Sequence, residues 1–150
     1  MEAVPRVHGI FKVNYGAKIG HIVDGTSNTM AIAEMVAGGE CSIRATHSYD
    51  EGPVVMTDFT PNDPTPDMVR WCDPADGQPN SRYPCDWTSG TQGSLAGQFN
   101  MIRHTARSTH AGGVMVGMCD GSSHFVSDSI ALEIWRALGT PDAGDLVEGF

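Results

Sequence analysis

Histidine and aspartate are the side chains of this chain that could support catalysis or bind a metal. The six histidines lie at positions 8, 21, 47, 104, 110 and 124, and no two of them have HxH or HExxH spacing. The sequence also contains no Gly-x-Ser-x-Gly turn and no Gly-rich phosphate loop. A Ser/His/Asp hydrolase would therefore need residues from distant parts of the chain, and metal catalysis has no local support.

Six aspartates between residues 58 and 86 suggest a cation site instead. Among them, Asp73 and Asp76 lie close in sequence to Asn80, with Gly77 as a turn residue between them. Carboxylate and amide oxygens suit a hard cation such as calcium, although the spacing differs from that of an EF-hand. Calcium is therefore the cofactor that the sequence suggests. The alternative is a solvated acidic loop without metal.

The stretch from 108 to 127 carries the strongest structural signal. A mostly apolar run over 114–119 is followed by Asp120-Gly121 and then by a second run over 122–127. Asp-Gly between two strand-like runs predicts a β-hairpin with a two-residue type I′ turn. In that register Val116 faces Phe125, so apolar side chains fall on both faces and the hairpin is expected at the centre of a covered sheet.

His110 and Asp120 bracket the first strand of this hairpin, with nine residues between them. An extended chain of that length separates them by about 20–30 Å, so they do not form a catalytic pair through this strand. We expect structural roles instead. Asp120 and Gly121 build the turn, while His110 with Gly112 and Gly113 sets where the chain joins the strand. The His110 imidazole is expected to bond a backbone carbonyl or a carboxylate.

A helix is predicted over residues 129–138. Asp128 or Ser129 can cap its first turn, Gly139 is a suitable C′ residue, and Pro141 prevents continuation. Its apolar residues form one stripe, which consists of Ile130, Ala131, Ile134, Trp135 and Leu138. The helix can therefore cover one face of the sheet.

The remaining segments complete a predicted α+β fold in one globular domain over 1–150. It is an antiparallel sheet around the hairpin 114–127, covered by the helix 129–138. Further strands are expected over 9–14, 29–37, 41–49 and 99–104, with one helical turn over 18–23. The first 37 residues also contain Asp24-Gly25, where a turn is expected.

Residues 51–87 form a long Pro-rich loop with seven of the nine prolines of the chain. Each proline fixes φ and removes a donor, so little regular structure is expected there. Trp71, Tyr83 and Trp87 lie in the same segment. These aromatic residues suggest an interaction surface, because large rings favour packing against another surface over solvation.

Charge and cysteine content restrict the class of protein. The net charge is −9, which argues against nucleic acid or an anionic membrane as partner, and no apolar stretch has the length of a membrane span. Cys72 and Cys85 flank part of the long loop, and in an exported protein they could form a disulfide worth about 3 kcal/mol. Four reduced, buried thiols are the alternative.

Two blocks of residues resemble a known bacterial family. The first is His110 followed after nine residues by Asp120-Gly121, and the second is the stretch from Asp24-Gly25 through Asn28 to Thr29, followed by Glu34. Together they resemble the prepilin-type-processing-associated H-X9-DG family, although Ala111 stands where relatives usually have proline. The resemblance implies a pilin-like head domain, in which these residues are structural. Relatives carry a basic leader and a long apolar N-terminal helix, neither of which is visible in this sequence.

The resemblance and the acidic, loop-rich composition lead to a functional hypothesis. We expect a non-enzymatic structural subunit of a pilin-like filament or assembly, extracellular or at the cell surface, which self-associates into a homo-oligomer. Contacts are expected from the N-terminal strand and the long loop, by strand addition or aromatic docking. A monomeric, secreted module that binds calcium or a glycan is the alternative, and a hydrolase is the third hypothesis.

Overall fold

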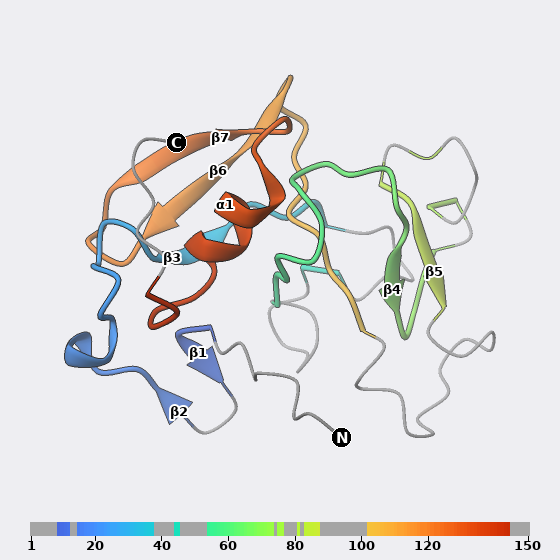
Figure 1. Ribbon diagram of the computed structural model, residues 1–150. Helices are drawn as coiled ribbons and strands as arrows, with labels where there is room; N and C mark the ends of the chain where they lie inside the picture. The colour runs from blue at the N-terminus through green and yellow to red at the C-terminus, as the bar shows by residue number, and fades with distance from the viewer. Residues whose placement is uncertain are drawn as a thin grey trace.

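The computed structural model describes residues 9–12, 15–37, 44–45, 54–73, 75–76, 81, 83–87 and 102–144. Along the chain (Figure 1) its elements are β1 Phe11–Lys12, β2 Tyr15–Gly16, the 3-10 helix η1 Ile19–His21, β3 Met30–Ala33, β4 Asp67–Val69, β5 Cys85–Trp87, β6 Gly113–Met118, β7 Ser123–Ser127 and α1 Leu132–Leu138. Within these ranges, no helix has the length and apolar character needed to span a membrane.

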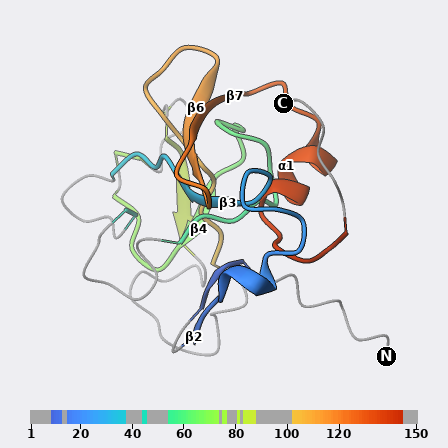
Figure 2. The same ribbon diagram turned by 90° about the vertical axis from the view of Figure 1, so that its left-hand side faces the viewer.

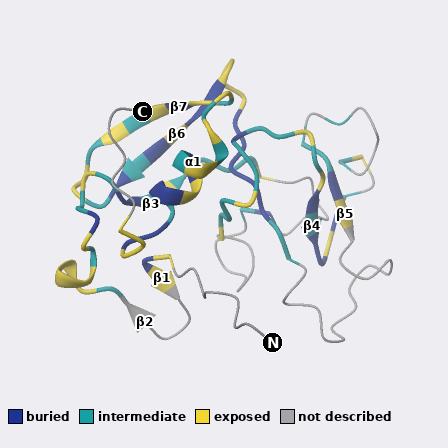
Figure 3. Ribbon diagram, in the orientation of Figure 1, coloured by how far each residue is buried: buried dark blue, intermediate teal, exposed yellow. Residues whose placement is uncertain are grey.

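Three strands form the central antiparallel sheet, in the order β3-β6-β7. Alternate residues of β6, namely Val114, Val116 and Met118, are buried on one face (Figure 3). α1 lies over this face, and its fully buried Trp135 belongs to the same apolar cluster. Figure 2 shows α1 on one side of the β6–β7 hairpin. The predicted α+β fold is therefore confirmed.

The register of the hairpin is one residue away from the predicted one. Met115, rather than Val116, lies opposite Phe125, and Val114 lies opposite Val126. Because side chains alternate between the two faces of a sheet, this slip moves Val126 into the core and Phe125 to the other face. The predicted covering of both faces is wrong, since Phe125 is 50% exposed and Met115 is 38% exposed.

The turn explains the register. Gly121 N donates to Met118 O at 3.0 Å, and Met118 N donates to Ser122 O at 2.9 Å. The loop therefore contains three residues, 119–121, rather than two. Gly121 has a φ of +88°, as expected for a type I turn followed by a G1 bulge. Asp-Gly does build the turn, but in the three-residue class.

α1 begins later than predicted. Its N-cap is Ala131, which makes no side-chain cap, and not Asp128 or Ser129. Asp128 Oδ1 accepts a hydrogen bond from Asn62 Nδ2 at 2.7 Å, and the Ser129 hydroxyl bonds to the Ser127 hydroxyl at 2.8 Å. Both predicted caps are thus engaged with other side chains, which a reading of helical periodicity does not detect.

Gly139 follows the helix for a different reason from the predicted one. Its φ is −80°, so it does not adopt the left-handed C′ conformation. A Cβ at this position would lie only 2.9 Å from Thr57 Cγ2. Glycine is required here because residues 54–60 approach the end of α1 closely.

Smaller elements surround the sheet. β1 pairs with β2 in antiparallel fashion, and η1 lies within the predicted helical turn 18–23. β4 and β5 pair in parallel inside the Pro-rich segment, where we expected little regular structure. Of the strand predicted over 41–49, Arg44 and Ala45 form a turn and the other positions lie outside the described residues. Of the strand predicted over 99–104, the described part forms an isolated bridge from Arg103 to Met68.

Candidate functional site

Glu34 and His110, which come from different sequence blocks, meet at one end of β6. His110 Nε2 lies 3.3 Å from Glu34 Oε1, and the two side chains are 55% and 32% exposed. Glu34 N donates to Met115 O at 3.0 Å, while Glu34 Oε2 accepts from Met115 N at 3.1 Å. Glu34 thus continues the β3–β6 pairing beyond the end of β3. The ion pair itself is worth no more than about 1 kcal/mol at this exposure.

The other ends of the two blocks meet at the hairpin turn. Cys119 N donates to Thr29 O at 2.9 Å, and Asp120 N donates to Thr26 O at 3.0 Å. The three-residue turn therefore docks on the loop that precedes β3. Glu34–His110 and this contact lie at opposite ends of the β3–β6 pair, so His110 and Asp120 do not share a site.

Asp24 joins the loop before β3 to the chain that follows α1. Its buried carboxylate accepts hydrogen bonds from Ala143 N at 2.9 Å and from Gly144 N at 3.0 Å. Its backbone carbonyl accepts from Asn28 Nδ2 at 3.0 Å. Asp24 therefore fastens the chain after α1 to the loop before β3, and Asn28 stabilises that loop.

Asp120, Ser122 and His124 are the serine, histidine and carboxylate that lie close together at the turn. Ser122 Oγ donates to Asp120 Oδ1 at 2.7 Å and lies 3.2 Å from His124 Nε2. In a hydrolase triad, the histidine stands between serine and carboxylate and accepts the serine proton. Here the serine proton points to Asp120, and the bonds from Ser122 hold the pKa of that exposed carboxyl below its usual range. In this arrangement, with Ser122 between Asp120 and His124, the hydrogen bonds stabilise the turn and do not activate the serine.

Ile32, Met115 and Phe125 form an exposed apolar surface on the side of the sheet opposite α1, which we call the outer face. Ile32 is 67% exposed, and Phe125 is 50% exposed. Two glycines of β6 provide the space beneath these side chains. A Cβ at Gly117 would lie 2.9 Å from Ile32 Cγ1, and one at Gly113 would lie 2.7 Å from the Phe125 ring. Gly113, Met115 and Gly117 alternate with the buried valines along β6, and this pattern is a sequence signal for the outer face that we did not use.

A groove of about 540 Å³ lies beside β3 and meets the outer face at Ile32. Its walls come from residues 9–11, from β3 and from residues 54–58, and Asp58 and Thr57 are its polar lining residues. β3 is an edge strand, since it pairs with β6 on one side within the described sheet. This part of the surface includes residues of the predicted N-terminal contact.

In the comparison with known families, residues 2–133 match the model described as "Protein of unknown function (DUF1559)". The chain belongs to the DUF1559 family. The match includes both sequence blocks and all three strands of the central sheet. Comparisons with curated proteins and with solved structures give no match.

The match also covers the Pro-rich segment, which in this DUF1559 protein is held by buried charges. Asp67 accepts two bonds from Arg107, at 3.0 and 3.1 Å, and one from Thr105 N at 3.0 Å. Arg44 Nη1 lies 3.4 Å from Asp67 and also donates to Tyr83 O at 2.8 Å. We call Arg44, Asp67 and Arg107 the polar core. The partners are 23 and 40 residues apart, so no local spacing indicated them.

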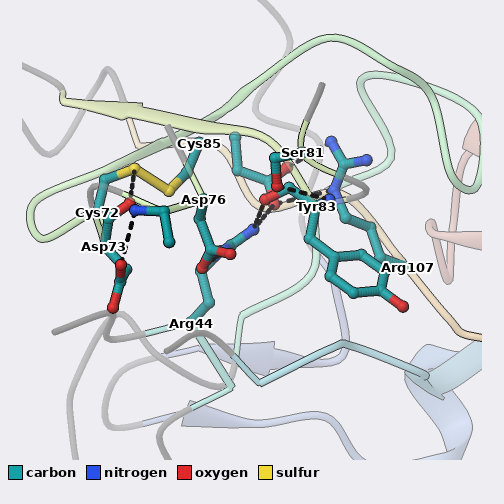
Figure 4. Close-up of a disulfide and its surroundings, with 10 residues drawn as sticks. Arg44, Cys72, Asp73, Asp76, Ser81, Tyr83, Cys85 and Arg107 are labelled. Atoms are coloured by element: carbon teal, nitrogen blue, oxygen red, sulfur yellow. Dashed lines mark hydrogen bonds and ion pairs between the residues drawn. A yellow bond between two sulfur atoms is a disulfide. The ribbon is translucent and has the colours of Figure 1, made fainter. Parts of the chain in front are cut away.

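The predicted disulfide between Cys72 and Cys85 is present and links the end of β4 to β5 (Figure 4). Cys119 is a free thiol, and its partial burial raises its pKa, with a further contribution from the charge of Asp120. Cys41 lies outside the described residues. The disulfide closes the loop that carries the predicted cation ligands.

The predicted cation ligands have protein partners. Asp73 Oδ1 accepts a hydrogen bond from Ala75 N at 2.8 Å, and Asp76 Oδ2 pairs with Arg44 Nη2 at 2.5 Å (Figure 4). Asn80 lies outside the described residues, and no group of three His, Cys, Asp or Glu side chains among those described could hold a metal ion. A cation in this loop would have to compete with Arg44 for Asp76.

We therefore expect calcium to leave the melting temperature unchanged. A site filled at 100 times its dissociation constant would add about 2.7 kcal/mol, which is easily seen as a thermal shift. The measurement is a melting curve in millimolar calcium beside one in EDTA. A rise of several degrees that Asp73→Asn removes would contradict this expectation and assign a calcium site to the loop.

Two of the three predicted aromatic contact residues can be placed. Trp71 is 40% exposed next to the disulfide, whereas Tyr83 is partly buried and its carbonyl accepts from Arg44. The side chain of Trp87 lies outside the described residues. An interaction surface in this loop stays a prediction, in which Trp71 is the more accessible of the two rings that the structure describes.

Proposed function

We propose that this DUF1559 protein is a non-enzymatic structural subunit of a pilin-like filament or assembly, extracellular or at the cell surface. The proposal agrees with the resemblance of His110, Asp120 and Gly121 to the prepilin-associated H-X9-DG family. The observation that carries it is the exposed outer face formed by Ile32, Met115 and Phe125. A sheet surface with large apolar side chains in water is typical of a protein contact.

The positions of the two blocks support a structural role for them. Asp24, Asn28, Glu34 and Asp120 hold the sheet and its flanking chain together through hydrogen bonds. The same blocks contain β3 and β6, which carry Ile32 and Met115 of the outer face. The Cys72–Cys85 disulfide supports the proposed location, because disulfides persist in oxidising compartments outside the cytosol.

We propose a second copy of the chain as the partner of the outer face. With a net charge of −9, two copies repel each other over most of their surface, so cohesion must come from apolar area. Burial of apolar side chains contributes about 25 cal/mol per Å². An isologous contact would use each of the three residues twice, which doubles the effect of any single substitution.

The test is electron microscopy of the protein from its native source, together with sedimentation velocity over a concentration series. Phe125→Ser is expected to weaken self-association by about tenfold or more, because a half-exposed phenylalanine is removed from both copies. Val23→Ser is the matched control, since Val23 is 68% exposed away from the sheet, and it should leave association unchanged.

Regular filaments, or oligomers that dissociate in Phe125→Ser, would support the proposal. Isolated particles from the native source, together with a monomer at every concentration, would overturn it. An equal effect of Val23→Ser would mean that association is non-specific and would also contradict the outer face as the contact.

A further inference from the structure

His104 is a fully buried imidazole with little polar contact. Its exposed fraction is zero, and within the described part of the chain neither Nδ1 nor Nε2 has a hydrogen-bond partner of good geometry, while the backbone of Val54 lies close enough to influence the imidazole. A buried polar group in this state is uncommon, because it loses its bonds to water without replacing them. The packing around His104 therefore keeps its imidazole buried.

The backbone around His104 joins three segments. Met56 N donates to His104 O at 2.8 Å, which attaches residues 54–60. Arg103 and Met68 exchange two backbone hydrogen bonds of 2.9 Å each, which attach β4. Figure 1 shows the chain that leads into β6 passing between the central sheet and β4. His104 thus lies where the Pro-rich segment is fastened to the rest of the fold.

The charged groups that act on His104 are Asp67 and Arg44 of the polar core. Burial is the main influence and lowers the pKa of His104; the carboxylate of Asp67 and the backbone of Val54 raise it, and Arg44 lowers it again. Asp67 is shared by two buried guanidinium groups, those of Arg44 and Arg107. A protonated His104 would therefore add a further positive charge beside groups that are already buried.

We propose that His104 is a proton-operated switch that releases residues 54–60 from residues 102–107 in mildly acidic conditions. When these segments separate, water reaches the imidazole and can solvate its charged form. The central sheet, whose core is apolar, does not depend on this charge and stays folded. The switch thus opens the molecule at one contact instead of unfolding it.

The direction of the pH effect follows from linkage. The pKa of His104 is lower in the closed state than its ordinary value of 6.5, so the open state binds more protons. The stability of the closed state is complete above about pH 6.5 and is lost as the pH falls through that value towards the lowered pKa. Within that window, the opening equilibrium increases by up to about tenfold for each pH unit.

Hydrogen exchange with mass spectrometry at several pH values, corrected for the intrinsic exchange rate, tests this in the whole chain. Opening of 54–60 and 102–107 is expected to rise by up to about fivefold between pH 6.5 and 5.5, with 113–127 unchanged. His104→Leu should reduce this rise to less than about twofold. His21→Gln is the control, because the exposed His21 lies in η1, outside both segments, and it should behave as the parent protein.

A measurement on the unsubstituted protein keeps the test decisive if His104→Leu does not fold. Imidazole resonances followed by NMR should show that His104 stays neutral in the closed state as the pH falls below 6.5. Titration of His104 near pH 6.5 without a change in exchange of 54–60 would overturn the switch. Uniform opening of all segments, including 113–127, would overturn it as well.

Discussion

Asp67→Ala is expected to destabilise the protein by about 3–5 kcal/mol, because it removes the charge partner of buried guanidinium groups. The side chains of Arg107 and Arg44 are 3% and 1% exposed, so neither can recover its bonds in water while the fold persists. Thr105 N loses its acceptor as well. Small proteins are stable by only about 5–15 kcal/mol, so the variant should have much less resistance to urea.

Chemical denaturation followed by tryptophan fluorescence measures this effect. Asp142→Ala removes an exposed carboxylate after α1 and is the matched control, with an expected change within about 0.5 kcal/mol. Arg107→Ala should cost a similar amount to Asp67→Ala, and the double substitution should cost less than the sum by about 0.5–3 kcal/mol. Additive effects, or a loss of less than about 1 kcal/mol for Asp67→Ala, would contradict the described ion pair.

Gly113→Ala is the second substitution with a large expected effect. The added Cβ would lie 2.2 Å from Val126 O and 2.7 Å from the Phe125 ring. The side chain of Phe125 can move, but the backbone oxygen belongs to the paired strand β7. We expect a loss of about 3 kcal/mol, the upper end of typical overpacking costs, together with weaker self-association because Phe125 is displaced.

Gly20→Ala provides the control for this prediction. Gly20 lies in η1, and a Cβ there would meet no atom within 4 Å. Its melting temperature should stay close to that of the parent protein, whereas that of Gly113→Ala should fall by several degrees. Equal melting temperatures for the two variants would show that β6 and β7 do not approach as closely as described.

Features that depend on residues near in sequence could be predicted without a structure. Asp120-Gly121 indicated a turn, and the apolar stripe indicated the helix that contains Trp135. Cys72 and Cys85 are separated by 13 positions, a spacing that a single loop closes easily. In each case the controlling physics is local: backbone conformation, helical periodicity, or the closure of a short loop.

The hairpin register shows where local reasoning ended. Asp-Gly is compatible with a two-residue and a three-residue loop, and the choice between them changes which side chains share a face. Docking of Cys119 N and Asp120 N on the loop before β3 accompanies the longer loop, and that contact joins positions about 90 residues apart. The exposure of Phe125, on which the proposed function depends, could therefore not be predicted from the sequence.

By itself, the sequence indicated the α+β class, a turn at Asp120-Gly121, the C-terminal helix and Cys72–Cys85 as the favoured disulfide pair, because short-range geometry restricts these. The tertiary structure alone decided that Glu34 meets His110, that Asp67 binds Arg44 and Arg107, and that His104 is fully buried. These contacts join segments that are tens of residues apart, and the sequence alone allows each of these side chains many other partners. Only the packing of β3, β4 and the residues before β6 selects one of them.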